Sequence, residues 1–136
     1  MFPIIKKYPV TLALASAIIC ACLLPIPDVP AAANVPLFDK WTHMLMYAGL
    51  CTALWTEYWR CHQHASVSHH LRQRAGHLML TAMLEPLTLS GMLELLQAYG
   101  TTYRSGEWLD FAANAIGVAL GTIVGIVLGR IVRPKK

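Results

Sequence analysis

Four long apolar segments constrain this chain more than any other feature of its sequence. They run over about residues 9–24, 39–59, 77–99 and 108–131. A helix needs about 20 mostly apolar residues to cross a bilayer, and each segment is close to that length. Only 13% of the residues are charged, against about 25% in soluble domains. We therefore expect an all-α membrane protein, a single domain over residues 1–136 that forms a bundle of four transmembrane helices.

The distribution of lysine and arginine predicts the orientation of these helices. Basic residues are enriched on the cytoplasmic side of membrane proteins. With four spans, most of the basic residues fall on one side, and only Lys40 and Arg104 fall on the other. Both termini and the loop over residues 60–74 are then cytoplasmic. The net charge of +4 is distributed by membrane side and not along one patch, so nucleic acid is not an expected partner.

The N-terminal segment has a second interpretation. Lys6 and Lys7, an apolar core from Val10 to Leu24, and Ala31-Ala32-Ala33 follow each other as in a cleaved secretory signal. The proline-rich stretch after Leu24 is long for such a signal, and the charge distribution of four spans is consistent without cleavage. We expect the first helix to be retained, with cleavage as the alternative.

The cytoplasmic loop is rich in potential metal ligands. It contains Cys61, His62, His64, His69 and His70. Their spacing matches no standard zinc finger, so we expect a solvated, weakly basic loop. We assign no metal and no cofactor to the chain. The other three cysteines lie in apolar segments, where a thiol usually packs as a small hydrophobic side chain.

Polar and charged side chains gather at the outward ends of the last three apolar segments. Asp39 and His43 are spaced i, i+4 at the start of the second segment, and Tyr47 lies one turn deeper on the same face. Lys40 lies beside them and is long enough to extend to the interface. The second segment therefore presents a carboxylate, an imidazole and a phenol on one helix face.

The third and fourth segments carry matching polar faces. Ser90, Glu94 and Gln97 share one face of the third, and Asp110 and Asn114 are spaced i, i+4 on the fourth. Ionisable groups next to hydrocarbon are costly and indicate a functional site. We expect a charge-compensated pocket open to the outer face. Its candidate ligand-binding residues are Asp39, Lys40, His43, Ser90, Glu94, Gln97, Arg104, Asp110 and Asn114, with Ser105 as the expected N-cap of the last helix.

Glycines recur at every fourth position of the last segment. They are Gly117, Gly121, Gly125 and Gly129. Such a ridge of small residues lets two membrane helices approach closely. We assign these glycines to helix packing within the bundle, with self-association into a homo-oligomer as the alternative use.

The order and spacing of these motifs resemble the VanZ-like family. The resemblance covers residues 36–129 and is carried by the motifs D-K-x-x-H, S-x-x-x-E-x-x-Q, R-S and D-x-x-x-N-x-x-G-x-x-x-G, which begin at Asp39, Ser90, Arg104 and Asp110. Members of the family are small bacterial membrane proteins, and the namesake is associated with resistance to the glycopeptide antibiotic teicoplanin. The resemblance implies a multi-pass protein of the bacterial inner membrane. It implies no particular reaction.

Three classes of function are consistent with the sequence. In the first, the outward pocket binds a membrane lipid, a lipid-linked cell-wall precursor or a glycopeptide antibiotic, and Lys40 and Arg104 contact its phosphate or carboxylate. In the second, the chain is an intramembrane enzyme acting on an envelope lipid, with His43 as general base. No nucleophile motif supports this, and we do not expect an enzyme. In the third, the polar residues only fix helix packing.

Overall fold

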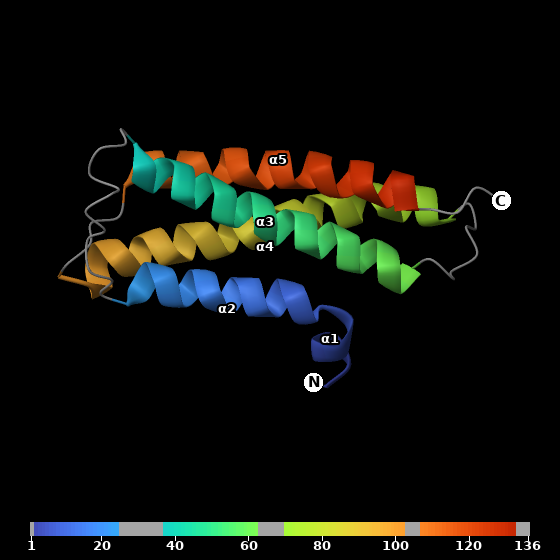
Figure 1. Ribbon diagram of the computed structural model, residues 1–136, viewed down its shortest axis with the longest axis horizontal. Coiled ribbons are helices and arrows are strands. Elements are labelled where there is room, and N and C mark those ends of the chain that lie inside the picture. Colours follow the sequence, from blue (N-terminus) through green and yellow to red (C-terminus); the bar gives the residue numbers. More distant parts are fainter. Residues whose placement is uncertain (1, 25–36, 63–69, 103–106, 133–136) are drawn as a thin grey trace.

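Helices account for nearly all of the chain that the structure, a computed structural model, describes: residues 2–24, 37–62, 70–102 and 107–132. The all-α expectation is confirmed for these residues. The described residues form five helices, which are labelled in Figure 1: α1 (Phe2–Lys7), α2 (Pro9–Leu23), α3 (Phe38–His62), α4 (His70–Gly100) and α5 (Trp108–Val132).

The four long helices lie side by side and alternate in direction (Figure 1). The end of α2, the start of α3, the end of α4 and the start of α5 lie together, and we call this the polar end of the bundle. The opposite end carries α1 and is called the basic end. α3 packs most extensively against α5, while α2 contacts α3 and α4, and α4 also contacts α5.

Two helix boundaries differ from the sequence prediction. α3 continues to His62 and α4 begins at His70, so the loop expected over residues 60–74 is shorter than predicted. Leucine, glutamine and arginine at the start of α4 favour helix, and residues 70–75 contain no glycine or proline. The short helix α1 was not predicted. The His/Cys-rich stretch was predicted to be a solvated loop, but Cys61 and His62 end α3 and His70 begins α4. His64 and His69 lie outside the described residues.

The glycine stripe of α5 lies against α3. A Cβ atom on Gly117 would lie 2.3 Å from the Met44 carbonyl oxygen, and one on Gly121 would lie 2.3 Å from that of Ala48. Thr52 of α3 also donates a hydrogen bond to the Gly121 carbonyl at 3.3 Å. Because Gly117 and Gly121 have no side chain, the backbones of α3 and α5 can come into contact at these positions. Further along, Gly125 lies against Trp55 and Gly129 against Trp59.

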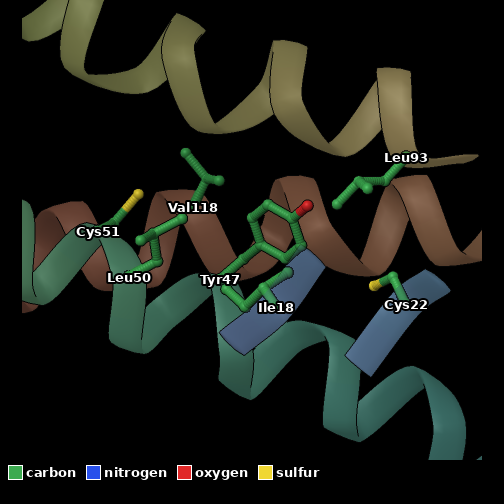
Figure 2. Packing of buried hydrophobic residues seen from close by; sticks show 7 residues of the cluster. All are labelled: Ile18, Cys22, Tyr47, Leu50, Cys51, Leu93 and Val118. Carbon is green, nitrogen blue, oxygen red and sulfur yellow. The ribbon is translucent and has the colours of Figure 1, made fainter. Parts of the chain in front are cut away.

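A small apolar core lies at the middle of the bundle (Figure 2). In this view the Tyr47 ring of α3 lies between Ile18 of α2, Val118 of α5 and Leu93 of α4. Tyr47 is 1% exposed. The core thus joins all four long helices. Its buried members are Ile18, Cys22, Tyr47, Leu50, Cys51, Leu93 and Val118.

One helix among the described residues is long and apolar enough by itself to cross a membrane. It is the segment Trp108–Ile131 of α5, with a mean hydropathy of 2.1. α2 is apolar but has only 15 residues. Length and composition alone therefore qualify one described helix, and not four, as a membrane span.

Candidate functional site

An ion-paired cluster joins α3 to the start of α5 at the polar end. The Lys40 Nζ atom lies 2.5 Å from Glu107 Oε2 and 2.5 Å from Asp110 Oδ1. Asp110 is buried, at 5% exposure, whereas Glu107 is exposed. The hydrogen bond from the Lys40 ammonium lowers the pKa of the Glu107 carboxyl. Lys40 thus serves as the counter-ion of two carboxylates.

His43 is buried directly below the exposed Asp39. Its imidazole is 3% exposed, and its Nε2 atom lies 3.8 Å from Asp39 Oδ1, which is beyond hydrogen-bond distance. A potential metal-ligand atom from each of Asp39, His43 and Asp110 lies within 4.8 Å of the other two. The i, i+4 spacing therefore places Asp39 and His43 together as predicted from the helix period.

Glu94 connects α4 to the beginning of α5. Its Oε2 atom accepts a hydrogen bond from the Glu107 backbone N–H at 3.1 Å. Backbone N–H groups at a helix start have no partner within the helix and carry a partial positive charge, so a carboxylate is favourable there. The sequence predicted Ser105 as the cap of this helix, and Ser105 lies outside the described residues.

A buried hydrogen bond between side chains links α4 to α5 below this cluster. The Asn114 Nδ2 atom donates to Ser90 Oγ at 2.8 Å, and both residues are at most 1% exposed. The Asn114 Oδ1 atom has no hydrogen-bond partner among the described residues. The bond couples two helices that pack less extensively than α3 and α5.

Replacing Ser90 by alanine is expected to destabilise the fold by about 1 kcal/mol, because it leaves the Asn114 amide without its partner inside the bundle. Thermal unfolding of the purified protein in detergent measures this change. Ser16→Ala on α2 is the matched control, since the Ser16 hydroxyl is exposed and bonds only within its own helix. An equal effect of both substitutions would contradict the interhelical role of Ser90.

Gln97 lies in the contact between α4 and α2. Its Nε2 atom donates a hydrogen bond to the Cys22 carbonyl at 2.9 Å, in a buried position. Cys22 is close to the end of α2, and the last carbonyl groups of a helix receive no hydrogen bond from within that helix. The structure therefore gives the amide of Gln97 a partner on α2, whereas the sequence assigned Gln97 to the ligand pocket.

The described residues cover part of the predicted charge-compensated pocket, namely four carboxylates and one ammonium. The Lys40 ammonium is paired with two of these carboxylates, those of Glu107 and Asp110. Arg104, the second predicted cation, lies outside the described residues. The carboxylates are those of Asp39, Glu94, Glu107 and Asp110.

Sequence reasoning missed Glu57 at the basic end. Glu57 is 4% exposed, and its carboxylate accepts hydrogen bonds from the Val10 and Thr11 backbone N–H groups at 2.9 and 3.0 Å. The Thr11 hydroxyl donates a third bond at 2.8 Å. Glu57 thereby caps the first turn of α2 from a distant helix. An acidic residue inside an apolar segment was the signal that could have identified it.

Comparisons of the chain with protein-family models, with curated proteins and with solved structures found no match. The site must therefore be interpreted from its own chemistry. Its described groups can bind cations through carboxylates and an imidazole, and can accept hydrogen bonds from a polar headgroup. Of the residues that carry the VanZ-like resemblance, Asp39, His43, Glu94 and Asp110 lie at the polar end.

Proposed function

We propose that this chain is a VanZ-like membrane protein of the bacterial cell envelope. In this proposal α2 to α5 each cross the inner membrane, and the outward polar end binds the headgroup of an envelope lipid, a cell-wall precursor or a glycopeptide antibiotic. The observation that carries the proposal is the inverted distribution of side chains: polar residues are buried between the helices, and large apolar residues cover the outside.

The inverted distribution supports a lipid surrounding. Leu45, Leu84 and Leu95 are each more than half exposed on α3 and α4, and the outer face of α5 is equally apolar. Water-soluble monomers rarely expose apolar patches of this extent. In a bilayer such side chains contact lipid, while polar groups face the bundle interior. The buried polar residues are His43, Glu57, Ser90, Gln97, Asp110, Asn114 and Thr122.

The short helix α2 fits a four-span arrangement with local adjustment of the bilayer. Its 15 residues give a length of about 22 Å at 1.5 Å per residue, against about 30 Å of hydrocarbon. Thinning of the bilayer next to a short span costs only fractions of a kcal/mol per Å. In this proposal α2, which is about 8 Å shorter than the hydrocarbon layer, spans a locally thinned bilayer beside α3 and α4.

The ends of the bundle support an outward orientation of the polar end. Described basic residues at the opposite end are Lys6, Lys7, Arg60, Arg72, Arg74 and Arg130. The positive-inside rule places that end in the cytoplasm. Tyr99 and Trp108 are the most exposed of the described aromatic side chains at the polar end, at 88% and 87%, as expected for aromatic residues at a membrane–water interface.

The described charges favour a ligand whose polar end includes an ammonium group. Asp39 is half exposed and Glu94 is partly exposed, so both carboxylates can be reached from outside the bundle. Carboxylates form strong charge-assisted hydrogen bonds with ammonium groups. Lys40 is held by Glu107 and Asp110 and is less suited to bind a phosphate than the sequence suggested.

Loss of the two accessible carboxylates is expected to weaken ligand binding. The variants are Asp39→Asn and Glu94→Gln, which preserve shape, and the control is Glu85→Gln, an exposed acid elsewhere on α4. Native mass spectrometry and fluorescence titration measure binding of phosphatidylethanolamine, of a lipid-linked cell-wall precursor and of teicoplanin. Each variant should bind the recognised probe roughly tenfold more weakly, because a hydrogen bond to a charged group contributes about 1.5–3 kcal/mol.

Other outcomes separate the proposed function from its alternatives. If no probe binds, or if both variants bind as tightly as the control, the ligand-binding proposal is wrong. If the variants lose folded protein to the same extent that they lose binding, the polar residues serve only packing. Accumulation of a modified lipid in cells with the wild-type protein, absent with folded variants, would indicate an enzyme.

A further inference from the structure

Three side chains at the polar end have the chemistry and spacing of metal ligands. A ligand atom from each of Asp39, His43 and Asp110 lies within 4.8 Å of the others. In a tetrahedral zinc site, bonds of about 2.0–2.2 Å place two ligand atoms about 3.3–3.6 Å apart. The 3.8 Å between His43 Nε2 and Asp39 Oδ1 is slightly longer than this range. Asp39 is half exposed, so rotation of its side chain can close the remaining gap.

The burial of His43 is a second, independent indication of a ligand. The side chain is 3% exposed, and its Nδ1 atom has no hydrogen-bond partner among the described residues. Its Nε2 atom is too far from Asp39 for a hydrogen bond. A polar group buried without a hydrogen bond carries a desolvation cost. The nitrogen that faces Asp39 is Nε2, so a metal ion among these residues would bond Nε2 and give the buried imidazole a partner there, while Nδ1 would keep its cost.

The charge around His43 also favours a cation. Asp39 and Asp110 lie beside it, and the Glu94 carboxylate is near enough to interact with both acids and with His43. Neighbouring carboxylates at a membrane interface repel each other unless cations are present. Lys40 is paired with both Asp110 and Glu107. If a metal ion replaces Lys40 at Asp110, Lys40 keeps Glu107 as its partner.

We infer that Asp39, His43 and Asp110 form a binding site for one divalent transition-metal ion at the polar end of the bundle. An imidazole with two carboxylates is a mixed nitrogen and oxygen ligand set, which suits zinc and its neighbours better than magnesium. The inference goes beyond the proposed function and does not depend on it, because the metal alone is the ligand.

Titration with Co²⁺, whose visible absorption reports its ligands, tests the inference on the purified full chain in detergent. The titrated protein is a background variant in which five other potential ligands are replaced by serine or asparagine. These are Cys61, His62, His64, His69 and His70. We expect one Co²⁺ per chain, displaced by Zn²⁺. His43→Ala and Asp39→Asn should each bind at least about tenfold more weakly. Lys40→Met, which removes a competing cation, should bind several-fold more tightly.

Glu85→Gln in the same background is the control and should bind like the unsubstituted protein. Asp39→Asn changes a half-exposed side chain, so circular dichroism should show an unchanged helix content. Absence of stoichiometric Co²⁺ binding in both the background protein and Lys40→Met would overturn the inference, and so would equal binding by His43→Ala, Asp39→Asn and the control. No lipid or antibiotic probe is added, so either result leaves the test of the proposed function intact.

Discussion

Replacing Gly117 and Gly121 together by alanine is expected to destabilise the fold by on the order of 3–5 kcal/mol. Each added Cβ atom would lie 2.3 Å from a backbone carbonyl oxygen of α3, that of Met44 or of Ala48. A backbone oxygen cannot rotate away as a flexible side chain can. Overpacking at one site costs about 1–3 kcal/mol, and here α3 and α5 must separate along their closest contact.

The control for this experiment is Gly49→Ala on α3, where an added Cβ atom would meet no other atom within 4 Å. Thermal unfolding in detergent, followed by circular dichroism, compares the double variant with the control. A double variant as stable as Gly49→Ala would show that the two helices do not pack as described. Dissociation of an oligomer with unchanged unfolding would instead support the use of the glycine stripe in self-association.

Close packing of α3 and α5 also determines the geometry of the candidate site. Lys40 lies about one turn before Met44 on α3, and Asp110 lies about two turns before Gly117 on α5. Their 2.5 Å ion pair requires that the helix starts stay as close as the glycines permit. Loss of the glycines is therefore expected to disturb the polar end as well as the stability.

Features that depend on the period of one helix were predictable from the sequence. The spacing of Asp39 and His43, and that of the four glycines, follows from 3.6 residues per turn, and the structure places each set on one helix face. The ends of the apolar segments also indicated α2, α3 and α5 to within a few residues. Sequence signals for the first and last residues of a helix are weaker than the signal of its period, so the early start of α4 was not predicted.

Partners across helices could not be predicted from periodicity. Which residue faces Lys40 depends on the rotation and depth of α5 relative to α3, and these are decided by packing at Gly117 and Gly121. For the same reason the sequence placed Gln97 in the pocket, although its amide bonds to α2. The sequence prediction considered polar residues at the outward ends of the apolar segments, and it therefore omitted Glu57, which lies at the opposite end.

Replacing Glu57 by alanine is expected to destabilise the fold by about 2–4 kcal/mol. The substitution removes the acceptor of three hydrogen bonds and leaves the Val10 and Thr11 N–H groups without a partner at the start of α2. An unsatisfied donor costs about 1–3 kcal/mol when it is buried, and these two donors are part-buried. α2 begins with Pro9 and makes no side-chain cap hydrogen bond from Tyr8, so Glu57 supplies the cap that its own sequence lacks.

Two further variants separate capping by Glu57 from the loss of a negative charge. Glu57→Gln keeps one acceptor oxygen and should lose about half as much stability as Glu57→Ala in thermal unfolding. Glu85→Ala removes an exposed acid of α4 and should change stability by less than about 0.5 kcal/mol. Protease sensitivity confined to the N-terminal segment of Glu57→Ala would locate the effect at α2. Equal unfolding temperatures for Glu57→Ala and Glu85→Ala would contradict the cap, because the Glu57 carboxylate bonds to the backbone of α2 whereas Glu85 is an exposed acid.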